Sequence, residues 1–228
     1  QVAGARLIRA KLGQEMADLL GKAKAVRILA CGTSFHAGLV ASYWLESIVG
    51  LPCRVEVASE FRYRSTRALA GEIIIAISQS GETADTLAAV QEARNRGFVG
   101  VAAICNVDES SLVRAADATL LTHAGPEIGV ASTKAFTAQL VALALLVVAI
   151  AERREAQPDL RQALRNLPAQ MEQVLALDPV IEQLSERFAD KHHALFLGRG
   201  IHYPIALEGA LKLKEISYIH AEGYPAGE

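Results

Sequence analysis

The chain has 228 residues, of which 51% are hydrophobic and 21% charged, a composition typical of one large globular domain or one and a half smaller ones. Its formal net charge of −2 gives no general attraction to nucleic acid or to an anionic membrane surface. Three cysteines without a C-x-x-C pair predict reduced thiols and a cytoplasmic protein, not a disulfide-linked secreted one.

From residue 25 onward, short runs of β-branched residues alternate with Ala/Leu-rich segments. We expect strands at residues 26–30, 53–57, 73–77, 99–105 and 118–122. We expect helices at residues 37–48, 84–96, 111–116 and 134–153. Such alternation is typical of βαβ units, and it predicts a parallel sheet with helices on both faces. In that architecture ligands bind beyond the carboxyl ends of the strands.

The longest apolar run, residues 140–151, is too short for the roughly 20 residues that a helix needs to cross a bilayer. We therefore interpret it as a buried core helix and expect no membrane contact. Residues 1–24 carry charges throughout, which is not typical of a signal peptide.

The pattern starts again after a polar linker with Pro158. Residues 28–34 (I-L-A-C-G-T-S) and 194–200 (A-L-F-L-G-R-G) are both strand-to-glycine turns that open a helix, and related tags follow at 57–63 and 220–224. This repetition predicts a duplicated α/β domain.

The first domain is expected at residues 1–155. Residues 156–228 would hold a linker helix and the first strand and helix of the second copy. Since so small a sheet cannot cover itself, we expect further chain or another molecule to cover it.

The segment 71–86 is the most informative. A buried strand passes directly into a helix through Ser78, Gln79, Ser80, Gly81 and Thr83. Such a junction presents unpaired N–H groups and hydroxyls, which is typical of a phosphate site. We expect Gly81 to allow close approach of the ligand. No Lys or Arg lies between positions 71 and 94, so neutral dipoles would do the binding.

Two further turns carry hydroxyls. Thr33 or Ser34 is expected to cap the helix after the first strand, and Ser132 or Thr133 the helix at 134–153. Two interpretations of these turns stay open. The hydroxyls only cap the helices, or the two turns form further walls of the same phosphate pocket. Cys31 is interpreted as a small buried residue.

The last helix, expected at residues 204–218, carries Glu208, Lys212 and Glu215 on one face. Two interpretations stay open: a surface ladder of ion pairs, or a carboxylate beside a lysine in a cleft, acting as a positioned base. The chain has no P-loop and no dinucleotide fingerprint. The adjacent pair His192 and His193 lacks metal-ligand spacing, so we expect no metal and no cofactor.

Five motifs together resemble the sugar isomerase (SIS) family, and within it the isomerase half of the glucosamine-6-phosphate synthases. They are A-C-G-T-S, A-S-E-F-R-Y-R, S-Q-S-G-E-T-A-D-T, E-I-G-V-A-S-T-K-A-F-T-x-Q and A-L-E-G-A-L-K-L-K-E-I-S-Y-I-H-A-E-x-Y. The resemblance implies an SIS-type three-layer αβα sandwich with a parallel sheet, plus the start of a second similar domain. It also implies conversion of fructose 6-phosphate and ammonia to glucosamine 6-phosphate by a homodimer.

Site residues follow from the resemblance position by position. The sugar phosphate would be bound by Ser34, Ser78, Gln79, Ser80 and Thr83, with the backbone of Thr33 nearby. Val130 would contact the sugar through its main chain, and Ser132 would lie in the same wall. Glu215 would move a proton between C2 and C1, and Lys212 would orient the open-chain sugar.

The chain also departs from that family. It has no cysteine-initiated glutaminase domain, and it ends at Glu228, before a histidine and a lysine that take part in the family's sugar chemistry. We therefore expect a fragment that releases no ammonia from glutamine and does not turn over. The alternatives are a stand-alone SIS ketosugar-phosphate isomerase or deglycase, and a sugar-phosphate-sensing regulator.

Overall fold

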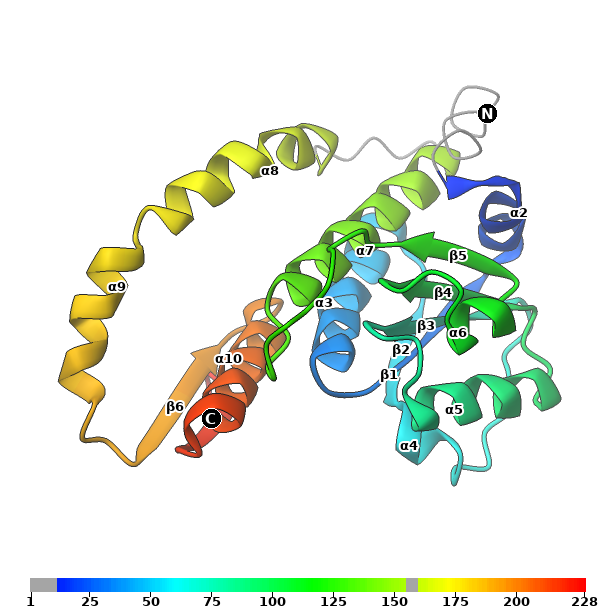
Figure 1. The fold of residues 1–228 in the computed structure, drawn as a ribbon. Coiled ribbons are helices and arrows are strands. Elements are labelled where there is room, and N and C mark those ends of the chain that lie inside the picture. Colours follow the sequence, from blue (N-terminus) through cyan, green and yellow to red (C-terminus); the bar gives the residue numbers. More distant parts are fainter. Residues whose placement is uncertain (1–11, 155–159) are drawn as a thin grey trace.

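The computed structural model describes residues 12–154 and 160–228, and Figure 1 shows their arrangement. One sheet has the strand order β2-β1-β3-β4-β5, and every neighbouring pair runs parallel. Its strands are β1 (Ala25–Ala30), β2 (Cys53–Val57), β3 (Glu72–Ser78), β4 (Val101–Cys105) and β5 (Ala118–Leu121). Because β1, β3 and β4 are buried along their whole length, both faces of the sheet must be covered.

Helices cover the two faces and make three layers (Figure 1). They are α2 (Gln14–Lys22), α3 (Gly32–Val49), α4 (Ala58–Phe61), α5 (Ala84–Asn95), α6 (Ser111–Ala115) and α7 (Lys134–Arg153). The alternation of β3 divides the core. Ile73, Ile75 and Ile77 join the cluster under α2, α3 and α7, whereas Ile74 and Ala76 join the cluster under α4, α5 and α6. The predicted three-layer α/β fold is confirmed.

Helix α7 is the apolar helix that the sequence predicts. By length and composition it passes as a membrane-spanning candidate, but 61% of its most apolar window is buried inside the protein. Leu143, Leu146 and Val147 belong to the same core cluster as the sheet residues, and α7 packs along α3. The expectation of a core helix at residues 140–151 is confirmed.

The chain then forms a second, smaller unit. Its elements are α8 (Leu160–Leu175), α9 (Asp178–Ser185), the 3₁₀ helix η1 (Glu186–Phe188), β6 (His193–Gly198), α10 (His202–Ser217) and β7 (His220–Pro225). Strands β6 and β7 pair in parallel with α10 between them in the chain, just as β1 and β2 pair around α3. The repetition seen in the sequence is thus present in the structure.

Two details of that repetition were wrong. The second copy holds a second strand, β7, beyond the strand and helix that were expected. The two sequence tags also differ in structure, because residues 57–63 run from the end of β2 into α4 whereas residues 220–224 lie within β7. A strand with Gly223 and Pro225 in it lacks the β-branched pattern by which the other strands were predicted.

The second unit leaves apolar side chains open to solvent. Leu195 and Leu197 of β6 are 67% and 63% exposed, and Ile216 of α10 is 68% exposed. Figure 1 shows α8 and α9 as an arm that leads from α7 to β6 and stands away from the larger sheet. Within the ranges that the structure describes, the small sheet is therefore only partly covered, as expected for two strands.

Two helical regions differ most from expectation. Helix α3 begins at Gly32, five residues before the expected start, and ends at Val49, followed by Gly50 as the C-cap residue with a left-handed backbone (φ +64°). The expected linker helix within residues 156–228 is divided into α8 and α9. Pro179, near the start of α9, has no N–H to continue the preceding helix, so the chain turns there and restarts.

Candidate functional site

The loop between β3 and α5 forms a cradle of hydroxyls and backbone N–H groups. Ser78 Oγ accepts a hydrogen bond from the Gly81 N–H at 3.0 Å and lies 3.2 Å from Thr83 Oγ1. Ser80 Oγ accepts from the Glu82 N–H at 3.2 Å. These contacts fix the side chains around the start of α5, where the helix leaves N–H groups unpaired.

Gly81 has a structural role that the sequence did not predict. Its backbone is left-handed (φ +68°), and an added Cβ would overlap the side chain of Ser110 and crowd Cys105. The glycine therefore makes room for the neighbouring turn of the protein itself. A second contact ties that turn to the cradle, because the Ser111 N–H donates to Glu82 Oε1 at 2.7 Å and lowers the pKa of Glu82.

The turn after β1 contributes a second wall. The expectation that Thr33 or Ser34 caps α3 was wrong, because Cys31 occupies the N-cap position and no side chain closes the cap. Ser34 is instead buried, and its Oγ accepts from Gln139 Nε2 of α7 at 3.0 Å. Cys31 is only partly buried and lines the cavity described below, contrary to the expected burial.

The loop before α7 gives a third wall. Thr133 is the N-cap residue, but its side chain does not cap the helix. Glu127 replaces it, because Glu127 Oε2 accepts from the Ala135 N–H at 3.0 Å. Ser132 faces the cavity, whereas the Val130 side chain is 97% exposed and is not among the cavity-lining residues.

Helix α10 brings the titratable groups. Lys212 Nζ lies 2.6 Å from Glu215 Oε2 and 3.4 Å from Glu208 Oε1, so the predicted shared face of these three residues is confirmed. The surface-ladder interpretation is wrong for Glu208, which is only 5% exposed. Its Oε1 accepts from Thr33 Oγ1 at 2.9 Å, which joins α10 to α3.

These walls enclose one polar cavity of about 250 Å³. It is lined by Cys31, Thr33, Ser34, Ile77, Ser78, Gln79, Ser80, Thr83, Thr86, Ser132 and Glu215. Of the ten predicted site residues, eight line it together. Lys212 adjoins it through Glu215, and the Val130 side chain lies outside it. Side chains from the start of α3, from β3 and the loop after it, from the loop before α7 and from α10 are thus brought to one place, and the one carboxylate among them is Glu215.

Sequence reasoning missed one close neighbour of this site. His36 Nδ1 lies 2.7 Å from Glu208 Oε2, across 172 positions of sequence. The available signal was its place three residues after Thr33, on the same side of one helix. Within residues 12–154 and 160–228, no three His, Cys, Asp or Glu side chains gather as a metal site would require.

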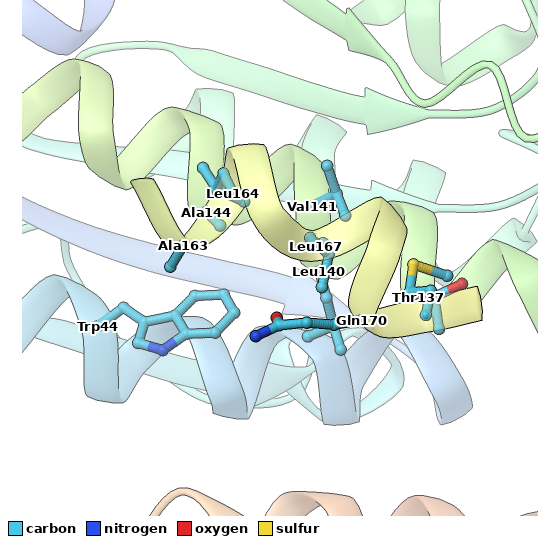
Figure 2. Close-up of a pocket in the computed structure, with 10 residues that line it drawn as sticks. Trp44, Thr137, Leu140, Val141, Ala144, Ala163, Leu164, Leu167 and Gln170 are labelled. Atoms are coloured by element: carbon cyan, nitrogen blue, oxygen red, sulfur yellow. The ribbon is translucent and has the colours of Figure 1, made fainter. Parts of the chain in front are cut away.

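A second cavity, of about 340 Å³, is apolar and lies apart from the predicted site residues. It separates α8 from α3 and α7, as Figure 2 shows with Trp44 on one side and Leu164 and Leu167 on the other. The cavity lies where α8 packs against the first unit. It offers few polar groups that could fix a phosphorylated ligand.

Comparison with known proteins agrees with this geometry. The profile of the SIS domain matches residues 19–149 and 187–228. The chain belongs to the SIS domain family. In this SIS chain both matched segments carry walls of the polar cavity, since Ser34 and Ser78 lie in the first and Glu215 in the second.

Similar proteins carry a common name. The glutamine–fructose-6-phosphate aminotransferase (isomerizing) of Pseudomonas putida is 62% identical over 95% of this chain and 36% of its own length. The Escherichia coli protein of that name is 55% identical over 96% of this chain and again 36% of its own length. The SIS chain thus spans little more than a third of these relatives.

Solved structures extend the comparison. The C-terminal domain of glucosamine-fructose-6-phosphate aminotransferase from Francisella tularensis superposes with a TM-score of 0.91 at 49% identity, covering 99% of this chain and 67% of that one. The tagatose-6-phosphate ketose/aldose isomerase of Escherichia coli superposes with a TM-score of 0.73 at 20% identity, covering 96% of this chain and 62% of that one. The second likeness is one of fold alone.

Proposed function

We propose that this chain is the sugar-phosphate-binding isomerase portion of an enzyme that converts fructose 6-phosphate and ammonia to glucosamine 6-phosphate. One observation carries the proposal: a hydroxyl-rich cradle and a carboxylate paired with a lysine face the same 250 Å³ cavity. The relatives that are 55% to 62% identical bear the aminotransferase name, which favours this function over a stand-alone isomerase or a regulator.

Phosphate binding is assigned to the cradle. Hydroxyls and N–H groups at the start of α5 would surround the phosphate oxygens, as helix N-termini commonly do. The residues concerned are Ser34, Ser78, Gln79, Ser80 and Thr83, with the Thr33 backbone nearby, while Ser132 and the main chain of Val130 would approach the sugar. Without a cationic side chain in the lining, hydrogen bonds would supply the affinity.

Proton transfer is assigned to Glu215. Its carboxylate would take a proton from C1 of the open-chain imine and return it at C2, which turns the ketose derivative into the aldose. The ammonium of Lys212, 2.6 Å from that carboxylate, would hold it in place and orient the sugar oxygens. Glu208 and Thr33 hold Lys212 in turn.

The domain division and the assembly are parts of the same proposal. Residues 1–155 would be one SIS unit, and residues 156–228 a linker helix with the first part of a second, as the repeated β-α-β pattern supports. A homodimer in the cytoplasm is proposed from the family resemblance.

Calorimetric titration with fructose 6-phosphate and glucosamine 6-phosphate tests the proposal. We expect binding by the wild-type chain and at least a tenfold loss of affinity in the double variant Ser78→Ala, Ser80→Ala. Ser185→Ala, which removes an exposed hydroxyl from α9, is the matched control and should bind normally. Absence of binding by the wild type, or unchanged binding by the double variant, would refute the cradle.

A further inference from the structure

A chain of polar contacts runs from His36 on α3 to Glu215, which lines the polar cavity. Glu208 Oε2 lies 2.7 Å from His36 Nδ1, and Glu208 Oε1 accepts from Thr33 Oγ1. Lys212 Nζ donates to the same Thr33 oxygen at 3.0 Å and pairs with Glu215. His36 and Glu208 stand outside the cavity lining, and they reach the site through Thr33, which lines the cavity, and through Lys212.

Lys212 lies between two carboxylates that compete for it. The distances are 2.6 Å to Glu215 and 3.4 Å to Glu208, and the Glu208 side chain is the more buried of the two, at 6% against 35% exposed. A carboxylate in a less polar surrounding attracts a cation more strongly, because the local dielectric is lower. Burial alone would therefore draw Lys212 toward Glu208 and away from the cavity.

His36 offsets that attraction. An ionised carboxylate only accepts hydrogen bonds, so the 2.7 Å contact requires a proton on His36 Nδ1. That N–H satisfies Glu208 Oε2, while the Thr33 hydroxyl satisfies Oε1. Because donors on α3 satisfy both oxygens of Glu208, its attraction for the ammonium of Lys212 is weaker. The shorter contact of Lys212 is therefore with Glu215.

We propose that His36 is a positioning residue: by donating to Glu208, it keeps Lys212 on Glu215 in the geometry that the sugar chemistry needs. The proposal rests on the proposed function for its consequence, but its contacts are present without substrate. The charged groups that α10 turns toward His36 and its partners are Glu208, Lys212 and Glu215. From α7, the polar group at this end of α3 is Gln139, which contacts Ser34.

The test compares two substitutions of His36. His36→Asn keeps a donor, because the amide nitrogen of asparagine stands about where Nδ1 does, whereas His36→Leu removes it. For the leucine variant we expect about a tenfold loss of affinity for fructose 6-phosphate, with inorganic phosphate binding changed less than twofold. The asparagine variant should restore fructose 6-phosphate binding to within threefold of wild type. His192→Leu, on the exposed end of the second unit, is the matched control.

A spectroscopic readout separates this proposal from the proposed function. In ligand-free protein labelled with ¹³C at glutamate carboxyls, the Glu215 signal should shift in His36→Leu and stay in place in His36→Asn. If the wild type fails to bind fructose 6-phosphate but the Glu215 signal behaves so, the proposed function falls and the positioning role stands. An unmoved Glu215 signal, or equal defects in both variants, overturns the positioning role.

A double-mutant comparison covers the case in which His36→Leu folds poorly. In a Glu208→Gln background the competing charge is gone, so replacing His36 by leucine should change fructose 6-phosphate affinity less than twofold. An undiminished tenfold effect in that background would show that His36 acts by another route and would overturn the proposal.

Discussion

The hydroxyl of Thr33 and the ammonium of Lys212 lie 3.0 Å apart, although 179 positions separate the two residues. The same hydroxyl donates to the buried Glu208 carboxylate. One side chain at the start of α3 thus holds two charged groups of α10, and it connects the first unit to the second.

Replacing Thr33 by valine should remove both of these contacts at once. Valine keeps the shape but offers Glu208 no donor and Lys212 no acceptor, so we expect a loss of about 1–3 kcal/mol in the free energy of unfolding. Chemical denaturation followed by circular dichroism measures it. Thr137→Val, an exposed position on α7, makes the same change outside this contact and should cost less than about 0.5 kcal/mol. Equal losses in both variants would contradict the role of Thr33.

The cradle should depend on the absence of a side chain at position 81. Gly81→Ala combines a left-handed backbone with overlap on Ser110, so the loop must move. Backbone strain of this kind costs about 1–3 kcal/mol, and the overlap with Ser110 adds to that cost. We therefore expect the free energy of unfolding to fall by at least about 3 kcal/mol and sugar-phosphate binding to be lost. Gly97→Ala is the control, because its backbone is equally left-handed (φ +84°) but a Cβ there meets open space. If both variants bind fructose 6-phosphate equally well, the crowding argument fails.

A buried arginine should matter more for stability than for function. Arg27 of β1 is 2% exposed and makes a double hydrogen bond to Glu72 at 2.9 and 3.2 Å, with Glu56 at 3.2 Å. Arg27→Met would leave Glu72 buried without its cation, which costs about 3–5 kcal/mol, whereas Glu56 would keep its ion pair with Arg64.

The control for this change lies on the neighbouring strand. Arg54 is the register partner of Arg27 on β2 and its side chain is 57% exposed, so Arg54→Met should stay within about 0.5 kcal/mol of wild type. Thermal unfolding monitored at several protein concentrations gives both values. A loss below about 1 kcal/mol for Arg27→Met would show that Glu72 finds another partner.

The thiol of Cys53 should be unreactive in the folded chain. Burial, with help from Glu46 and Glu72, raises the pKa of Cys53 to about 12 from an ordinary value of 9.0. At pH 8 only about one molecule in ten thousand would carry the thiolate, so iodoacetamide should label Cys31, which lines the cavity, well before Cys53. Peptide mass spectrometry after timed labelling decides between them, with urea-unfolded protein as the control.

The same shift gives a pH dependence with a definite sign. The folded chain retains the Cys53 proton more tightly than the unfolded chain, so this group contributes stability below pH 9. That contribution is lost as the pH rises from 9 to about 12. A free energy of unfolding that increases over this range in wild type relative to Cys53→Ala would contradict the burial of the thiol.

Local patterns explain why much of the fold was predictable. The β-branched run at 73–77 predicts a strand buried on both faces, and hydroxyls follow it directly. Because parallel strands have their carboxyl ends at the same edge of the sheet, these hydroxyls lie where ligands bind in this fold. Eight residues of the cavity followed from that rule and from the family resemblance.

Contacts between the two units were not predictable, because they depend on how α10 packs on α3. The one local signal for His36 is its place three residues after Thr33, and its partner Glu208 lies in the other copy of the repeat. The helix caps failed for a related reason: the tertiary contacts of Thr33 and Ser34 take the hydroxyls that local capping rules would assign to the backbone.

The cavity takes its walls from both copies of the repeat, with Ser78 at the edge of the first sheet and Glu215 on the helix of the second. On the proposed function, the packing of α10 against α3 therefore sets the distance between the phosphate site and Glu215. A sugar would react only when its phosphate lies on the cradle and its carbonyl end reaches Glu215, so the packing of α10 on α3 would select the length of the sugar's carbon chain. Substitutions in the contact between α3 and α10 would change which sugar length is accepted and leave phosphate binding unchanged.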